Sequence, residues 1–322
     1  MLPASIIPDR PRPGKNHDGA ARMKRTRGVA LLLLLSVVSI GCGGRVGIDP
    51  TPLSTEPGAE LGAAFSPDGT SLAYEWASTD GESDIWVIDL ATETKRRVTY
   101  APGLDSNPAW SPDGKRIVFD STRDGGRNIY VVDAAMGEGK DPQQRARALT
   151  SGEAASCNPA WSPDGKRIAF DCNAGGRPDV CLMNVDGSAR TTLTRSTSDD
   201  VHPAWSPDGA LLAFSSTRTG QKDIWMTNAD GSHPRRLTVD REDEWDPVWA
   251  PDGKHVVYVR AGESGTRGFY EIYYDGRGAE QVFESYKDLR DPAVSPDGKQ
   301  IAFSANPEGD YNLYLVQFET PQ

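Results

Sequence analysis

The chain has 322 residues, of which 46 are acidic and 35 are basic, so its formal net charge is −11 at pH 7. Nucleic-acid binding depends on clustered Lys and Arg, and this acidic balance therefore argues against a nucleic-acid-binding protein. The length is sufficient for one large domain or two ordinary ones.

The first 42 residues have the pattern of a targeting sequence. The stretch "MKRTRGVALLLLLSVVSIGC" begins at Met23, has an apolar run from Gly28 to Ile40 and ends at Cys42. This order of segments is typical of a signal peptide over residues 23–42. The apolar run has 13 residues, whereas a bilayer-spanning helix needs roughly 20, so we expect cleavage.

The ending "SIGC" resembles a bacterial lipoprotein box, in which the Cys becomes the lipidated N-terminus. Ser39 departs from the aliphatic residue that is usual there, and ordinary cleavage near Gly41 is the alternative. We interpret residues 1–22 as the product of a mis-assigned start codon, with Met23 as the true start. Loss of residues 1–42 leaves 28 basic and 44 acidic residues, a net charge of −16, and residues 43–47 are expected to form a linker.

A turn signal, SPDG or APDG, recurs six times along the rest of the chain. The period of about 40–50 residues, with several short strands in each copy, is typical of propeller blades. The second copy is the longest, and its extra residues fall in the polar stretch from Met136 to Ala146, which we predict to be a surface loop. The copies start at Ser66, Ser111, Ser162, Ser206, Ala250 and Ser295, at spacings of 45, 51, 44, 44 and 45 residues.

The residue pattern of each copy predicts four strands. In "AWSPDGKRIAF" the Pro, Asp and Gly suit successive turn positions, so the flanking residues form a hairpin. A polar loop, a third strand such as "NIYVVD", a second turn "DGS" and a fourth strand such as "RRLT" follow. The strands are apolar on both faces, as in blades packed face to face, and the Trp before each turn is expected to pack between blades.

A constant spacing predicts how the ring closes. The apolar residue of each fourth strand lies 12 positions before the last residue of the next first strand, as in Val98 and Trp110. Leu53 and Phe65 have the same spacing, so Ile48 to Ser54 is a fourth strand without a blade of its own. The last copy ends with its third strand, Tyr311 to Phe318. We therefore predict an all-β fold, a six-bladed propeller over residues 48–319, with the sixth blade completed by the N-terminal strand.

The repeat "P-x-W-S-P-D-G-K-x-I-A-F-x-S-x-R-x-G", followed by "I-Y/W-V" and "D-G-x-x-x-x-L-T", resembles the propeller repeat of the TolB family of the Tol–Pal envelope system. The resemblance covers Ile48 to Phe318 and implies a periplasmic protein that binds envelope partners, such as a peptidoglycan-associated lipoprotein. TolB carries an additional α/β domain before its propeller, and only about 20 residues separate Cys42 from the first blade here. Similar repeats also occur in propellers attached to peptidases and in polysaccharide lyases, so the resemblance implies fold more firmly than activity.

No catalytic motif stands out in the sequence, and we name no catalytic residue. A peptidase domain would need G-x-S-x-G, whereas the nearest string is "GESG" from Gly262 to Gly265. His202, His233 and His255 lie in different repeat contexts and lack the spacing of metal ligands. We expect no cofactor, and a Ca²⁺ ion is the one metal that the acidic residues could favour.

Three cysteines, Cys157, Cys172 and Cys181, fall in the third copy. Disulfides are typical of exported proteins, and these residues are predicted on neighbouring strands of one blade. Cys172 could pair with either Cys157 or Cys181. The alternative is that all three remain reduced, because opposed strand positions often fit disulfide geometry poorly.

The position before the first-strand Pro is the candidate binding site. If the first strand is innermost, these polar side chains meet at the mouth of the central channel and could bind a cation, water, a short peptide or a sugar. Alternatively, they only cap the turn into the strand. We expect further acids to surround the same edge, namely Asp105, Asp199, Asp200, Asp243, Glu244 and Asp288. The mouth residues are Asn107, Asn158, His202, Asp246 and Asp291, with Gly62 in the first blade.

Three functions remain open at this stage. The first is a non-catalytic, monomeric binding propeller of the cell envelope that contacts the membrane only through an N-terminal lipid. The second is a lyase or hydrolase acting on a glycan, with its acids at the channel mouth. The third is a sensor for Ca²⁺ or a small ligand.

Overall fold

The structure, a computed structural model, describes residues 46–47, 50–54, 57–135, 146–152, 154–173, 176–262, 265–307 and 309–319. The predicted start, signal peptide and lipidation site at Cys42 lie outside these residues, as does most of the loop predicted at 136–146. Strand β1 (Val46–Gly47) falls inside the segment expected to be a linker, because the strand that it pairs with extends to Glu319. Within the described ranges, no helix is long and apolar enough to cross a membrane.

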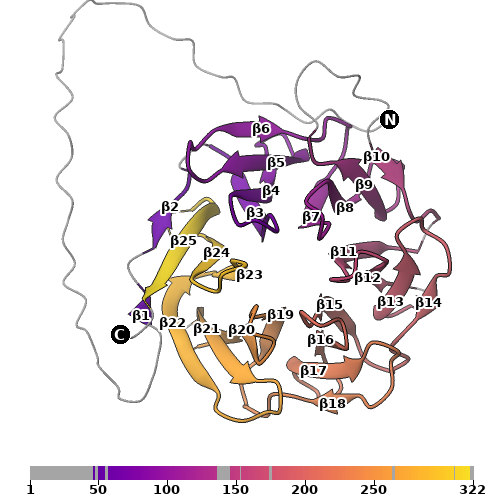
Figure 1. Ribbon diagram of the computed structural model, residues 1–322, viewed down its shortest axis with the longest axis vertical. Coiled ribbons are helices and arrows are strands. Elements are labelled where there is room, and N and C mark those ends of the chain that lie inside the picture. Colours follow the sequence, from indigo (N-terminus) through magenta and orange to yellow (C-terminus); the bar gives the residue numbers. More distant parts are fainter. Residues whose placement is uncertain are drawn as a thin grey trace, which may run out of the picture. The chain divides into compact units, whose positions relative to one another are not determined.

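Six antiparallel sheets surround a central axis as the blades of a propeller (Figure 1). Blade one contains β3 (Ala59–Phe65), β4 (Ser71–Ala77), β5 (Ser83–Asp89) and β6 (Lys95–Arg97). Blade two contains β7 (Asp105–Trp110), β8 (Arg116–Ser121), β9 (Asn128–Asp133) and β10 (Ala146–Ala148). Blade three contains β11 (Ser156–Trp161), β12 (Arg167–Cys172), β13 (Asp179–Asn184) and β14 (Thr191–Thr192).

Blade four contains β15 (Asp200–Trp205), β16 (Leu211–Ser216), β17 (Asp223–Asn228) and β18 (Arg235–Arg236). Blade five contains β19 (Glu244–Trp249), β20 (His255–Ala261), β21 (Thr266–Tyr273) and β22 (Glu280–Lys287). In each blade the strands pair in chain order, and the first strand lies nearest the axis (Figure 1).

Blade six joins the two ends of the propeller. It contains β23 (Arg290–Val294), β24 (Gln300–Ala305) and β25 (Asn312–Glu319), and both β1 and β2 (Thr51–Pro52) pair with β25. Thr51 lies opposite Leu315, and the backbone N–H of Leu53 donates to the carbonyl of Leu313 over 2.9 Å. The predicted six-bladed propeller, completed by the N-terminal strand, is confirmed.

Apolar side chains fill the spaces between neighbouring blades, as expected for strands that are apolar on both faces. Trp161 of blade three is 7% exposed and packs with Val118 and Ile129 of blade two. The indole N–H of Trp110 donates to the carbonyl of Ala64 in blade one over 3.1 Å. The predicted packing of the recurrent Trp between blades is confirmed at these two positions.

The SPDG turns form the hairpins at the far end of the innermost strands. In blade two, the hydroxyl of Ser111 and the N–H of Lys115 donate to the carboxylate of Asp113 over 2.5 and 3.1 Å. These bonds, led by the one from Ser111, lower the pKa of Asp113. Gly114 adopts φ 69°, which favours glycine. The motif therefore builds a turn, as expected.

Candidate functional site

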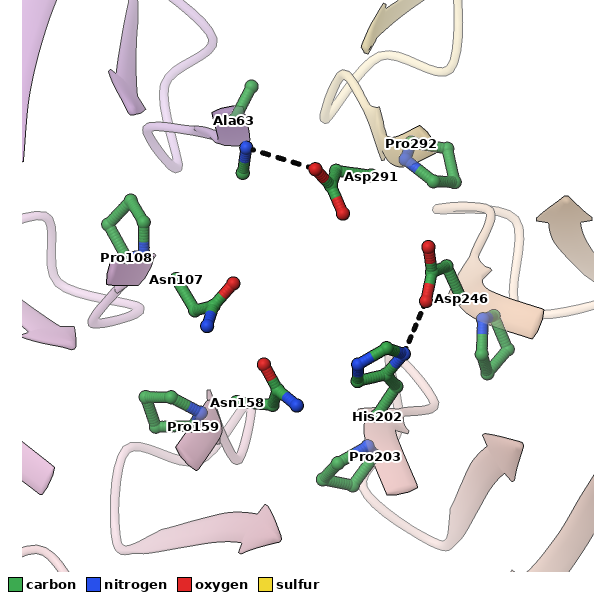
Figure 2. Close-up of a pocket in the computed structure, with 12 residues that line it drawn as sticks. Ala63, Asn107, Pro108, Asn158, Pro159, His202, Pro203, Asp246, Asp291 and Pro292 are labelled. Atoms are coloured by element: carbon green, nitrogen blue, oxygen red, sulfur yellow. Dashed lines mark hydrogen bonds and ion pairs between the residues drawn. The ribbon is translucent and has the colours of Figure 1, made fainter. Parts of the chain in front are cut away.

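The six positions before the first-strand Pro do meet at the mouth of the central channel. They line a cavity of about 170 Å³ together with the residue that follows each of them (Figure 2). All five predicted side chains and Gly62 are therefore neighbours around one space, although they are separated by up to 229 positions in the chain. The lining residues are Gly62, Ala63, Asn107, Pro108, Asn158, Pro159, His202, Pro203, Asp246, Pro247, Asp291 and Pro292.

The backbone explains which residue types occupy these positions. All six have φ between 50° and 59°, in the left-handed region. At each of them the register of the first two strands shifts, as between Ser106 and Ala109 in blade two. Gly adopts this conformation freely, and Asn, Asp and His are enriched there among other residues. Variation among Gly, Asn, His and Asp therefore follows from the backbone, and is not by itself a sign of ligand recognition.

We call the six mouth residues, Gly62, Asn107, Asn158, His202, Asp246 and Asp291, the ring. The same backbone turns the N–H groups of four of them toward side chains of the preceding blade. The N–H of Asn158 donates to Asp120 over 3.1 Å, and that of His202 to Asp171 over 2.9 Å. The N–H of Asp246 donates to the hydroxyl of Ser215 over 3.2 Å. In blade one the N–H of Gly62 donates to Asp291 over 3.3 Å. These bonds join neighbouring blades beside the axis.

Two buried acids behind the ring, Asp120 and Asp171, were not expected from the sequence. They lie on the second strands and are 0% and 2% exposed. The side-chain amide of Asn107 donates to Asp120 over 2.8 Å, and that of Asn158 donates to Asp171 over 2.6 Å. Arg127 also donates to Asp120 over 2.5 Å. A charged residue near the end of an apolar strand, the final Asp of "RIVFD" and "RIAFD", is the signal that could have identified them.

His202 and Asp246 form an ion pair at the mouth, through Nδ1 of the ring and Oδ1 of the carboxylate. Desolvation in the channel would lower the pKa of His202, but the charge and hydrogen bond of Asp246 raise it to about 9. Desolvation also opposes ionisation of Asp246, and the positive charge of His202 outweighs it and lowers the pKa of Asp246. The pair is therefore ionised at neutral pH.

Burial raises the pKa of Asp120, and three other carboxyl groups near the axis have pKa values raised to near neutral. Burial raises the pKa of Asp171 to about 7, and desolvation raises that of Glu75 on β4 to about 7. Desolvation, followed by the negative charge of Asp246, raises the pKa of Asp291 to about 6. These groups exchange protons near neutral pH, which is the property that a general base requires.

The further acids expected around this edge do not line the cavity. Asp105, Asp200 and Glu244 are completely buried within their blades, so the expectation is wrong for these three. Asp105 and Asp200 each bind an Arg of the same blade at 2.7 Å, Arg123 and Arg218 respectively.

A metal site is not evident within the described part of the chain, which contains no group of three or more His, Cys, Asp or Glu side chains able to hold an ion. His233 lies in an exposed turn next to Ser232, and His255 pairs with Asp252 at 2.6 Å beside another turn. Their contacts are those of local turn structure.

The cysteines of blade three follow one of the two pairings left open by the sequence. Cys172 and Cys181 form a disulfide with their Cα atoms 5.8 Å apart. Cys157 has a free thiol, whose pKa is raised by burial and by the charge of Asp171. Cys157 is therefore protonated at neutral pH and a poor nucleophile.

Comparison with known proteins yields both a family and similar folds. The TolB beta propeller domain family matches residues 49–147 and 141–321. A Tol-Pal system protein TolB from Desulfosudis oleivorans is 35% identical over 117 residues, which are 36% of this chain and 25% of that protein. The chain spans half or less of the length of the curated relatives that it matches.

Two solved structures illustrate the range of proteins that share the fold. A proposed TolB from Agrobacterium tumefaciens has a TM-score of 0.68 and 24% identity, covering 88% of this chain and 100% of its own. An oligogalacturonate lyase in complex with manganese has a TM-score of 0.59 and 17% identity, covering 87% of this chain and 99% of its own. At these identities the likeness concerns the fold alone. The family match extends over nearly all of the propeller, and the chain belongs to the TolB beta propeller domain family.

Proposed function

We propose that this protein is a non-catalytic propeller of the bacterial cell envelope that binds a protein segment or an envelope component at the channel mouth. One observation carries the proposal: five polar side chains and Gly62, one position from each blade, converge on a single cavity where the channel opens. Channel mouths of this kind are common binding sites, because they bring side chains from many strands to one place. Membership of the TolB beta propeller family supports this interpretation.

The location of the protein is part of the proposal. A relative is named as a Tol-Pal system protein, and the signal sequence at residues 23–42 would export the chain to the periplasm. The disulfide between Cys172 and Cys181 suits an oxidising compartment. Lipidation of Cys42 would then anchor a monomeric propeller to a membrane, and a peptidoglycan-associated lipoprotein is the partner that the family resemblance favours.

A glycan-active lyase or hydrolase is the second candidate. It is favoured by the carboxyl groups of Asp171 and Asp291, whose pKa values of about 7 and about 6 suit proton transfer. The cavity of about 170 Å³ counts against it, because pockets that enclose a whole ligand usually have 300–1,000 Å³, about twice that volume or more. A Ca²⁺ sensor, the third candidate, would have to use Asp246 and Asp291 as ligands.

Cross-linking in the native envelope tests the proposal. The wild-type protein and a variant carrying both Asp246→Asn and Asp291→Asn are expressed at equal levels, cross-linked, and the captured partners are identified by mass spectrometry. We expect the wild type to capture a defined envelope protein and the variant to capture less of it. Loss of turnover of a pectic oligosaccharide on the same substitutions, with no captured partner, would instead establish the enzyme.

A further inference from the structure

The cavity at the channel mouth presents hydrogen-bond acceptors almost exclusively. The amide nitrogens of Asn107 and Asn158 donate backward to Asp120 and Asp171, and this fixes both side chains with Oδ1 toward the cavity (Figure 2). In agreement, Oδ1 of Asn107 lies 3.6 Å from the position that a Cβ on Gly62 would occupy. The buried acids thus orient two amide oxygens toward whatever enters the channel.

Four of the six backbone N–H donors of the ring are already used, including that of Asp246, which donates to Ser215. The N–H groups of Asn158, His202 and Gly62 each donate to a carboxylate of the neighbouring blade. On the opposite side of the cavity Asp246 and Asp291 contribute carboxylate oxygens (Figure 2). Because Nδ1 of His202 contacts Asp246, its Nε2 is the ring atom that can still donate into the cavity.

The charges of the ring favour a cation. Asp246 and His202 neutralise each other as an ion pair, which leaves the carboxylate of Asp291 without an equal counter-charge in the ring. The volume of about 170 Å³ suits one side-chain head group and is too small for an oligosaccharide. Guanidinium and ammonium groups carry three to five N–H donors and no acceptor, so they complement this wall of oxygen atoms.

We propose that the channel mouth binds a single cationic side chain, the guanidinium of Arg or the ammonium of Lys, carried by the partner segment. This inference rests on the proposed function and specifies the chemistry of the ligand. Asp291 supplies the charge, and the oxygens of Asn107, Asn158 and Asp246 supply acceptors around it. The partner's cationic side chain would then occupy the cavity at the channel mouth.

Two groups of the ring, Asp291 and His202, make the affinity for such a cation depend on pH. Asp171, which faces His202, and Glu75 have pKa values of about 7, and their ionisation adds to the same trend. The groups that face Asp291 are Asp246, His202, Arg290 and Glu75, together with the N–H of Gly62. Protonation of Asp291, with its pKa of about 6, removes the net negative charge of the ring, so binding weakens as the pH falls through 6. Deprotonation of His202, with its pKa of about 9, leaves two uncompensated carboxylates, so binding strengthens as the pH rises through 9.

The test uses the full exported chain labelled with ¹⁵N and three short probes, acetyl-Gly-X-Gly-amide with X as Arg, Lys or citrulline. Citrulline has nearly the shape of Arg but no charge. Amide shifts of Gly62 and Asn158 report binding in NMR titrations at pH 5, 7 and 9.5. The variant Asp291→Asn removes the charge and keeps a residue suited to φ 53°. Asp297→Asn makes the same change in charge in an exposed turn at the other end of the inner hairpin.

We expect the Arg or the Lys probe to bind at pH 7, the citrulline probe to bind at least about tenfold more weakly, and Asp291→Asn to lose a similar factor. Asp297→Asn should bind as the wild type does. Equal binding of the Arg and citrulline probes, or an unchanged affinity in Asp291→Asn, overturns the inference. Failure of every probe, while the native protein still captures its envelope partner, refutes the cationic ligand and leaves the proposed function standing.

Discussion

The left-handed backbone at the channel mouth can be tested at Asn158 with two substitutions. Asn158→Gly removes the amide that donates to Asp171 over 2.6 Å but accommodates φ 50° without strain. Asn158→Ala removes the same bond but keeps a Cβ at a left-handed position, where Asn is tolerated better than Ala. A hydrogen bond to a charged, buried group contributes roughly 1.5–3 kcal/mol, so both variants should lose about that much free energy of unfolding.

The difference in free energy of unfolding between the two variants isolates the contribution of the backbone conformation. A left-handed conformation costs a non-glycine residue roughly 1–2 kcal/mol, and the greater freedom of Gly in the unfolded chain offsets roughly 0.4–1 kcal/mol of this. Asn158→Gly should therefore be more stable than Asn158→Ala by about 0.5–1 kcal/mol. Urea unfolding of the folded propeller, followed by Trp fluorescence at pH 8, measures both values. An alanine variant as stable as the glycine variant would refute the argument that backbone conformation selects the ring residues.

Two further predictions concern the disulfide and the ion pair. Replacing Cys172 and Cys181 by Ser should cost about 2–3 kcal/mol in urea unfolding, because the bond closes a loop with a sequence separation of 9; a wild type equally stable with and without reductant would contradict it. The folded-state pKa of His202 is raised from 6.5 to about 9, so its contribution to stability is full below pH 6.5 and is lost as the pH rises through 9. His202→Asn should show a flatter stability profile over this window, and a wild-type profile parallel to that of the variant would disprove the ion pair's role.

The fold was predictable because its signals are local and repeated. Each SPDG turn and each flanking strand is encoded within about ten residues, and the six copies fix the number of blades. The 12-residue spacing from Leu53 to Phe65 predicted the closing strand for the same reason. The additional strand β1 was not predicted, because Val46 and Gly47 carry no strand signal beyond their pairing with Phe318 and Glu319.

The ring around the channel could be predicted from the alignment of the copies, whereas its chemistry could not. Repetition places Asn107 and Asp291 at equivalent positions, and the innermost first strands bring them together. The bonds that join neighbouring blades behind this ring, such as that from the backbone N–H of Asn158 to Asp120, connect residues 38 positions apart. No local pattern in the sequence records such a contact.

The acids that were expected at the channel mouth but are buried, such as Asp105, also show how little local sequence says about side-chain contacts. Asp105 lies two residues before Asn107, yet it points into its own blade and binds Arg123, which is 18 positions further along the chain. The shift in strand register between Ser106 and Ala109 separates the two side chains. Sequence proximity to a ring residue therefore does not predict a place at the channel mouth.

The central claim is that a partner contacts the channel mouth, and site-specific photo-cross-linking in the native envelope tests it most directly. A photoreactive amino acid replaces Ala63, which lines the cavity, or Lys299, which is exposed in the SPDG turn of blade six. We predict a specific adduct with one envelope protein from position 63 and none from position 299. The absence of an adduct at position 63, or the same adduct at both positions, would contradict binding at the channel mouth.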